Sequence, residues 1–367
     1  MITQLINKSQ TDESKNSNSN QLKVVFRPYW TENPYQKLLI ANLEKLGVQI
    51  GNLNSRKKSS IIAEKPDVLH LHWLDDLFHF RVNSTIMSLL KLVKSITELC
   101  FLRLRGVKIV WTVHNLRNHE KLYPLLEKIC TFVVANLSYA IIAHSEIAKD
   151  EIAATINLRN KNKIFVIPHG NYNSYYENKI DRLEARKALN IPSSSFTFLF
   201  LGSIRPYKGV MELIAAFKQL SSNQSQLAIA GKTLNDTLAE EIRHEVEGDD
   251  NIKFIPGFVP DDQIQVYMNA CDVVVFPYQD LLTSGAVILA MSFGKVCVVP
   301  RKSYFTEVLN DSRAFFYDPD IAESLLQAMN CAIKRKTELQ SMGDRNRQVS
   351  QQWGWGRVAE MTLDVYM

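Results

Sequence analysis

The sequence predicts an α/β protein made of two doubly wound parallel sheets that face each other across a cleft. The chain has 367 residues, too many for one ordinary core, and its 46% hydrophobic content is enough to fill two. Short β-branched runs alternate with helix-length segments, which is typical of parallel strands joined by crossover helices. This alternation restarts in the middle of the chain, which indicates a second unit of the same kind.

The first unit begins after a polar leader. Residues 1–21 are rich in Ser, Asn and Lys and lack apolar periodicity, so we expect them to be disordered. The first Rossmann-like domain is then expected over residues 22–180. Its strands are predicted at residues 22–26, 67–73, 107–114, 139–145 and 163–170, and its longer helices at residues 35–47 and 85–102.

The second Rossmann-like domain is expected over residues 181–350. Its strands are predicted at residues 196–203, 226–231, 251–257, 272–277 and 295–300, with helices at 209–220, 237–246, 261–270 and 285–293. Residues 351–367 form an amphipathic helix with two Trp residues nearby. Two placements of this helix stay open, because it can pack back on the first domain or cap only the second.

Composition excludes several classes of protein. The net charge of +5 and the pI of 8.8 are modest, and the basic residues are spread along the chain, so no nucleic-acid partner is expected. The five cysteines are far apart and form no C-x-x-C pair, which favours buried thiols in a reducing compartment. No signal-peptide pattern and no membrane-spanning apolar run is present, so we expect a cytoplasmic protein.

The segment "FLGSIRPYKGV", residues 200–210, ends a predicted strand and begins a helix. Gly202 permits a tight turn, and Arg205 and Lys208 then precede Gly209. Two cations beside a helix N-terminus can bind a diphosphate, because backbone N–H groups add to the fixed charge. Taken alone, the segment fits solvated surface cations equally well.

A second strand-to-helix turn, "TSGA", strengthens the diphosphate interpretation. Thr283 or Ser284 can cap the following helix, and Gly285 lets the backbone approach a ligand closely. A carboxylate at this turn would repel a phosphate, and the turn has none. The apolar helix behind it, residues 286–293, is expected to be a buried support. The turn therefore predicts an anion site at the carboxyl edge of the second sheet.

Four segments resemble the donor-binding half of glycosyltransferases with the GT-B fold, in the broad glycosyltransferase family 4 and related bacterial cell-surface and exopolysaccharide transferases. They are "PHG", "GSIRPYKGVMELIAAF", "IPGFVPDDQIQVYMNACDVVVFPY" and "TSGAVILAMSFGKVCVVP". The resemblance implies two facing Rossmann-like domains. It places the nucleotide-sugar donor on the C-terminal domain and the acceptor on the N-terminal domain.

The resemblance also implies which residues bind the donor. Arg205 and Lys208 correspond to the diphosphate cations, and Phe258 and Val259 to the segment whose backbone contacts the base. The implied set is Gly202, Ser203, Arg205, Lys208, Lys232, Phe258, Val259, Thr283, Ser284 and Gly285.

The sequence departs from the family pattern at one motif. Many members carry two glutamates around the diphosphate loop, and Leu281 and Leu289 stand at those positions here. Neither leucine can hydrogen-bond a hydroxyl group. Recognition of the sugar and ribose must therefore come from other residues, and the retaining stereochemistry usual in that family does not follow.

The first domain offers candidate catalytic residues in "WTVHNLRNHE", which resembles the H-N-x-x-x-H-E loop of related transferases. His114, at a strand end, can hydrogen-bond the donor sugar or phosphate, and Glu120 can accept a proton from the acceptor. The alternatives are a core histidine and a solvated loop charge.

Asp75 is a second candidate base, just after the H-x-H pair His70 and His72. This pair lacks a third ligand at informative spacing, and the resemblance implies that cations and helix dipoles replace a divalent ion. We therefore predict no metal site and no cofactor besides the donor substrate.

The segment at residues 84–106, which contains the helix predicted at 85–102, has apolar residues at helical spacing, with lysines and arginines among them. Such a helix can rest on an anionic bilayer, where lipid-linked sugar acceptors are found. It can also be a packed crossover helix with a solvated outer face, and the spacing favours this second interpretation.

Together these features predict a metal-independent glycosyltransferase that moves a sugar from a GDP- or UDP-sugar to a glycan or lipid-linked acceptor. The process would be the synthesis of a cell-surface polysaccharide or glycolipid. Two alternatives stay open: a non-catalytic nucleotide- or glycan-binding protein of the same fold, and another nucleotide-sugar enzyme such as an epimerase.

Overall fold

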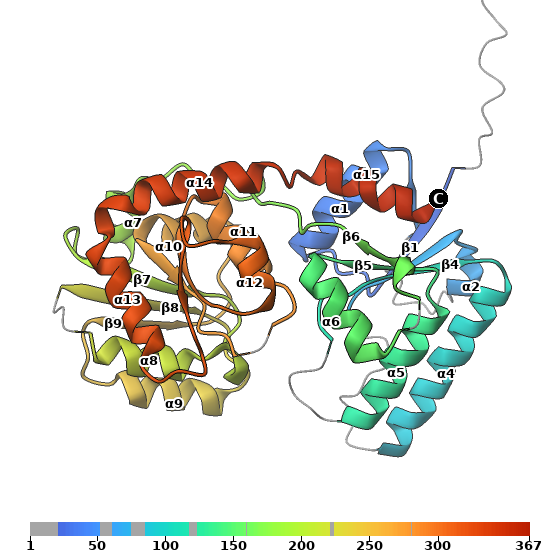
Figure 1. Cartoon of the computed structure of the whole chain (residues 1–367), viewed down its shortest axis with the longest axis horizontal. Coiled ribbons are helices and arrows are strands. Elements are labelled where there is room, and N and C mark those ends of the chain that lie inside the picture. The colour runs from blue at the N-terminus through green and yellow to red at the C-terminus, as the bar shows by residue number, and fades with distance from the viewer. Residues whose placement is uncertain are drawn as a thin grey trace, which may run out of the picture.

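A computed structural model describes residues 21–51, 61–74, 85–116, 123–158, 160–220, 224–279 and 281–367. Figure 1 shows two α/β lobes side by side, each built around its own sheet. The leader predicted at residues 1–21 lies, but for its last residue, outside the described residues. In the described part of the chain the strands form two six-stranded, all-parallel sheets, which confirms the predicted fold class.

The first sheet has the strand order β2-β1-β3-β4-β5-β6. Its strands are β1 (Lys23–Arg27), β2 (Gln49–Gly51), β3 (Val68–Leu71), β4 (Lys108–Thr112), β5 (Ala140–Ala143) and β6 (Ile164–Val166). Both faces are covered, so β3 and β5 are buried along their whole length and their sequences are continuously apolar or nearly so. The three-residue β2 was not predicted, because so short a segment has no readable alternation.

Helices pack on both faces of this sheet. They are α1 (Pro34–Lys45), α2 (Ile61–Glu64), α4 (Thr85–Leu104), α5 (Pro124–Leu137) and α6 (Glu146–Ile156), and a 3-10 turn spans Lys161–Lys163. Helix α1 begins at Asn33, whose side chain accepts from the Gln36 N–H at 3.2 Å, so "NPY" after the first strand is a capped helix start.

The second sheet has the strand order β12-β11-β10-β7-β8-β9. Its strands are β7 (Phe196–Leu201), β8 (Ser225–Gly231), β9 (Ile252–Pro256), β10 (Val273–Val275), β11 (Val296–Pro300) and β12 (Ala314–Tyr317). The order reverses between β7 and β10. In doubly wound sheets a ligand binds outside the carboxyl ends of the strands at such a reversal, so the topology itself selects one position on this edge.

The helices of this domain also cover both faces. They are α7 (Arg182–Ala188), α8 (Val210–Lys218), α9 (Asp236–Val246), α10 (Ile264–Ala270), α11 (Gly285–Ser292), α12 (Ser303–Val308), α13 (Ser324–Lys334) and α14 (Leu339–Gln351), with 3-10 turns at Pro206–Lys208, Asp261–Gln263 and Lys336–Glu338. Residues 287–292 of α11 are all buried, which makes this helix a fixed support for the turn before it.

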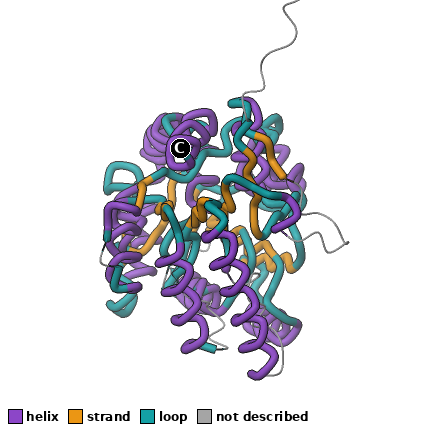
Figure 2. Tube along the Cα trace, turned by 90° about the vertical axis from the view of Figure 1, so that its right-hand side faces the viewer, coloured by secondary structure: helices purple, strands orange, loops and turns teal. Residues whose placement is uncertain are grey.

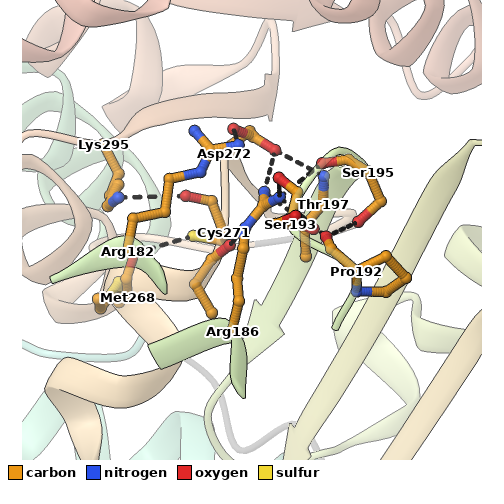
Figure 3. Close-up of polar contacts among 11 residues, drawn as sticks. Arg182, Arg186, Pro192, Ser193, Ser195, Thr197, Met268, Cys271, Asp272 and Lys295 are labelled. Atoms are coloured by element: carbon orange, nitrogen blue, oxygen red, sulfur yellow. Dashed lines mark hydrogen bonds and ion pairs between the residues drawn. The ribbon is translucent and has the colours of Figure 1, made fainter. Parts of the chain in front are cut away.

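A buried arginine ties α7 to the amino edge of the second sheet (Figure 3). Arg186 is 1% exposed, and its guanidinium bonds the Asp272 carboxylate at 2.9 Å. It also donates to the carbonyls of Ala270, Ser193 and Ser195 at 2.7–3.0 Å. A buried charge is tolerated only when it is paired and hydrogen-bonded in this way, so Arg186 has a structural role.

The last helix, α15 (Trp355–Tyr366), returns to the first domain and packs on α1 (Figure 1). Trp355 and Tyr366 belong to the same core cluster as Phe26, Tyr35 and Leu39. The Trp355 indole N–H donates to the Asn171 carbonyl at 2.6 Å. The C-terminal segment thus completes the core of the domain in which the chain begins.

Candidate active site

Four loops of the second domain meet at the carboxyl edge of its sheet. They follow β7, β8, β9 and β10, which are neighbours in the sheet. The Ile204 N–H donates to the Lys232 carbonyl at 2.8 Å, and the Gly257 N–H to the Gly231 carbonyl at 3.1 Å. The Gln279 N–H donates to the Tyr207 carbonyl at 3.1 Å. The loops that carry the predicted donor-binding residues are therefore joined to one another by backbone bonds.

Glycines allow this close approach. A Cβ on Gly209, which has φ +67°, would lie 2.0 Å from the Pro277 carbonyl oxygen of the β10 loop. A Cβ on Gly231, at φ +149°, would lie 1.8 Å from the Gly202 carbonyl oxygen. A larger residue at Gly209 would force apart the loops on the two sides of the strand-order reversal, and one at Gly231 would force the end of β8 away from the loop after β7.

Lys208 lies at the reversal itself, on the turn between β7 and α8. Its ammonium group donates to the Ser203 hydroxyl at 3.1 Å and lies 5.5 Å from the centre of the Tyr278 ring, which comes from the β10 loop. Burial, with a smaller contribution from the nearby Arg205 charge, lowers the pKa of Lys208 to about 8. Lys208 is half-buried, so its ammonium group gains from the charge of an arriving anion.

The loop after β10, on the other side of the reversal, leads into the N-terminus of α11. The Ser284 hydroxyl accepts from the Val287 N–H at 3.3 Å, so Ser284 rather than Thr283 caps the helix. Leu289 is buried in the core of the second domain, and Leu281 packs against that core. The two positions where many related enzymes carry glutamates therefore support the loop by apolar packing.

The other predicted donor residues line the rim. Lys232 is exposed on the turn after β8, and Phe258, after β9, is 77% exposed. Val259 is half-buried against the core. Arg205 is half-buried, and its guanidinium donates to the Ile204 carbonyl at 3.3 Å.

The facing edge of the first sheet carries a row of histidines. They lie at or after the carboxyl ends of four adjacent strands, β3 to β6: His70, His72, His114, His144 and His169. All five are buried, and burial is the main cause that lowers the pKa of each: to about 3 for His70 and His169 and about 4 for His144. At neutral pH these rings are therefore uncharged.

His114 is held by two neighbours. Its Nε2 lies 3.1 Å from Nδ1 of His72, and its ring stacks on Trp73 with centroids 4.2 Å apart. The other ring nitrogen of His72, Nε2, is buried and has no hydrogen-bond partner in the described part of the chain. A buried N–H without a partner is rarer than a buried acceptor without one. We therefore assign the shared proton to His72 Nδ1, which leaves His114 protonated on Nδ1.

Tyr35 and His169 connect this row to the donor side. The Tyr35 ring makes edge contacts with His72, His114, His144 and His169 at centroid distances of 4.9–5.9 Å. His169 Nε2 would lie only 3.1 Å from a Cβ on Gly285, the first residue of α11. The carboxyl edges of the two sheets thus meet at the N-terminus of α11.

The sequence analysis missed His144, His169 and Tyr35 as site residues. A signal for the histidines was present, because "HLH", "TVH", "AHS" and "PHG" place a histidine near the end of four successive predicted strands. Parallel strands bring such positions to one edge. Tyr35 stands in the "NPY" segment, which after the first strand fits either an acceptor-side turn or a helix start, and the structure shows a helix start.

Two predicted catalytic residues, Asp75 and Glu120, lie outside the described residues. His70 does not pair with His72 as a metal chelate, because its two ring nitrogens bond the hydroxyls of Tyr366 and Thr112 at 2.6 and 2.8 Å. Among the residues that the structure describes, no group of three His, Cys, Asp or Glu side chains is arranged to hold a metal ion.

Comparison with known proteins agrees with this geometry. Residues 181–349 match the model of the family described as "Glycosyl transferases group 1". The chain is 26% identical over 271 residues to the GDP-mannose:glycolipid 4-beta-D-mannosyltransferase of Xanthomonas campestris, covering 73% of this chain and 72% of that protein. It is 25% identical over 209 residues to the lipopolysaccharide 1,2-N-acetylglucosaminetransferase of Salmonella typhimurium, covering 54% of each.

Solved structures match over nearly the whole chain. HepE of Anabaena in complex with UDP-glucose aligns with a TM-score of 0.71 at 16% identity, covering 94% of this chain and 98% of that one. Sucrose-phosphate synthase of Thermosynechococcus elongatus aligns with a TM-score of 0.74 at the same identity and coverage. At this identity the likeness shows the fold.

Fold and comparisons together define a protein of the GT-B class, with two facing Rossmann-like domains. The chain is a glycosyltransferase, and its residues 181–349 match the group 1 transferase model. This bears out the transferase prediction over the two alternatives, a non-catalytic binding protein and an epimerase.

Proposed function

We propose that this glycosyltransferase moves mannose from GDP-mannose to a glycan or lipid-linked acceptor during the synthesis of a cell-surface polysaccharide or glycolipid. The observation that carries the choice of donor is the similarity to a GDP-mannose:glycolipid mannosyltransferase over 73% of the chain. The anion site formed by Lys208 and the N-terminus of α11 would hold the diphosphate, with Arg205 beside it. The exposed Phe258 segment would contact the base.

The proposal includes an inverting reaction without a metal or other cofactor. The mannosyltransferase relative is named for a β-linked product. GDP-mannose carries its sugar through an α linkage, so a β product requires inversion. Inversion needs a base on the acceptor side, and Glu120 and Asp75 are the proposed candidates. His114, protonated on Nδ1, would serve as a hydrogen-bond donor to the donor sugar or phosphate. A cytoplasmic location belongs to the same proposal, whereas inversion argues against membership of glycosyltransferase family 4, in which retention is usual.

Thermal unfolding with a panel of nucleotide sugars tests the donor. A bound donor raises the unfolding temperature by mass action, so GDP-mannose and GDP should raise it more than UDP-glucose, UDP-N-acetylglucosamine or UDP at the same concentration. A shift with uridine nucleotides alone would reject the GDP-mannose assignment while leaving a transferase intact.

Stereochemistry and metal dependence are tested on the transfer reaction itself. NMR of the anomeric proton after transfer from GDP-mannose should show a β linkage, and Glu120→Gln or Asp75→Asn should lower kcat by about a hundredfold or more if that residue is the base. Transfer should persist in excess chelator, because Lys208, Arg205 and the α11 N-terminus offset the diphosphate charge. Activity lost to chelator and restored by magnesium or manganese would reject the metal-free reaction.

A further inference from the structure

The outer surface of the first domain carries an unusual concentration of exposed apolar side chains. Nearly half of the large hydrophobic residues exposed in the described part of the chain lie on α4 and α5, although these helices contribute only 20 and 14 residues. Figures 1 and 2 show the two helices side by side on the outside of the domain. We call this surface the α4–α5 face.

Helix α4 is apolar on two opposite sides. Leu92, Leu99 and Leu102 face the core and are at most 2% exposed. The opposite side, which helical spacing places along one stripe, carries Ile86, Leu89, Leu90, Val93, Phe101 and Leu104, all exposed. The sequence favoured a crossover helix with a solvated outer face. The helix does pack on the core and its outer face is exposed, but that face is largely apolar.

Exposed apolar residues of α5, which lies beside α4, widen this stripe. Leu125, Ile129 and Phe132 recur at spacings of four and three residues and are 70%, 42% and 52% exposed. Over the 20 residues of α4 the stripe is about 30 Å long, because an α-helix rises about 1.5 Å per residue. A soluble monomer rarely leaves so long an apolar surface open to water.

The charges around the stripe are mostly positive. Exposed or half-buried cations on and beside the two helices are Lys91, Lys94, Arg103, Arg105 and Lys128. Of the carboxylates on α4 and α5 in the described residues, Glu98 is paired with Arg27 at 2.9 Å and Glu127 is half-buried. An apolar stripe bordered by lysine and arginine is the pattern that binds in the interface of an anionic bilayer.

We propose that the α4–α5 face docks this protein on the surface of a membrane that contains anionic lipid. The apolar stripe enters the boundary between headgroups and acyl chains, and the cations bind lipid phosphates. A second copy of this chain is a poorer occupant, because a two-fold contact through this face would bring the same cations together. The proposal does not depend on the identity of the donor or acceptor.

Vesicle co-sedimentation of the full chain tests this docking. We expect binding to vesicles of phosphatidylcholine with about a third phosphatidylglycerol, much weaker binding to pure phosphatidylcholine, and weakening with added salt. The double variant Leu90→Gln and Val93→Gln removes two side chains that are 58% and 54% exposed. It should lower the partition coefficient about tenfold or more.

The second domain offers a matched control. Leu183 and Ile321 are 63% and 58% exposed, so the double variant Leu183→Gln and Ile321→Gln makes the same chemical change away from the α4–α5 face. It should bind vesicles like the parent protein. Both variants should unfold at the same temperature as the parent protein, and GDP should raise that temperature equally in all three proteins. These measurements separate failed docking from misfolding and from a wrong function.

Three results would overturn the proposal. The first is no binding to anionic vesicles by the parent protein. The second is an equal loss of binding in the α4–α5 variant and the control variant. The third is a parent protein that self-associates in sedimentation and does not bind vesicles, together with a Leu90 and Val93 double variant that is monomeric. That result would make the face a protein interface.

Discussion

Lys208 combines a charge that binds anions with surroundings that oppose the charge. Its ammonium group contacts Ser203 and the Tyr278 ring, and burial lowers its pKa from 10.5 to about 8. The protonated form is the one that binds a diphosphate, and this form is lost as the pH rises through about 8. A bound diphosphate favours the proton again, so proton uptake and nucleotide binding are linked.

We therefore expect the affinity for GDP to fall by up to about tenfold per pH unit above pH 8. Calorimetric titration at pH 7, 8 and 9 measures this dependence. Lys208→Met should weaken binding at pH 7 and flatten the pH profile, and should lower kcat/KM by about a hundredfold or more. Lys218→Met is the control, because Lys218 pairs with Glu245 at the far end of α8. An unchanged pH profile in Lys208→Met would remove Lys208 from the anion site.

His72 acts on the site through His114. Its Nδ1–H, 3.1 Å from His114 Nε2, sets the tautomer of His114 and with it the direction in which His114 can donate. His72→Phe preserves an aromatic ring beside Phe26, where the two rings now stack, but removes this bond.

For His72→Phe we expect kcat/KM to fall about tenfold, the worth of one hydrogen bond. Nitrogen NMR of histidine-labelled protein should show His114 as the Nδ1–H tautomer in the parent and as a mixture in the variant. A parent His114 protonated on Nε2 would contradict the assignment, and a loss of activity without a tautomer change would point to packing alone.

At the scale of elements, α11 combines an apolar body with a polar first turn, which is part of the proposed anion site. Its body is buried and supplies rigidity, while its first turn presents backbone N–H groups and the Ser284 cap. Cap strength and donor affinity can be separated here, because aspartate caps a helix as well as serine does but adds a negative charge.

Ser284→Ala should lower the free energy of unfolding by about 1 kcal/mol and keep most of the GDP affinity. Ser284→Asp should keep more of the stability and lose GDP binding about tenfold or more, because the carboxylate repels the diphosphate. Urea unfolding and GDP titration measure the two effects. Asp181→Ala, which removes the cap of α7, should cost similar stability without changing GDP affinity. Equal GDP affinities in the two Ser284 variants would contradict the anion role of this turn.

At the scale of the whole molecule, the two ends of the chain share one core. Helix α15 leaves the second domain and buries Trp355 and Tyr366 beside Tyr35 and Phe26. A second link lies on α12, where the Glu307 carboxylate accepts from the N–H groups of Glu146 and Ile147 at 2.9 Å and so caps α6 of the other domain. The domains are therefore joined by a side chain and a helix as well as by the linker.

Trp355→Ala should destabilise the first domain by about 3–5 kcal/mol, because it opens a cavity under Tyr35 and leaves the Asn171 carbonyl unpaired. Calorimetry should then show the first domain unfolding at a lower temperature than the second. GDP should raise the unfolding temperature of the second transition only. Trp30→Ala, which removes a partly exposed Trp of the same domain, is the control. A single transition lowered equally by both variants would contradict this role of α15.

The fold and the loops at the carboxyl edge of the second sheet were readable from local patterns. The alternation of strands and helices, and glycine or hydroxyl residues at strand-to-helix turns, are short-range features that depend on backbone geometry. They predicted two parallel sheets and placed Arg205, Lys208 and Ser284 on loops at one edge. The short strands β2 and β12 escaped notice, because their pairing depends on neighbours distant in the chain.

What the sequence by itself determined is the architecture of two doubly wound domains and the position of Lys208 and Ser284 on the loops after β7 and β10. The tertiary structure decided the placement of α15, which the sequence left open, and the meeting of five histidines around Tyr35. It also showed that the outer side of α4 is apolar. Each of these depends on which segments pack together in space, and hydrophobic burial is non-directional, so an amphipathic pattern alone does not specify its partner.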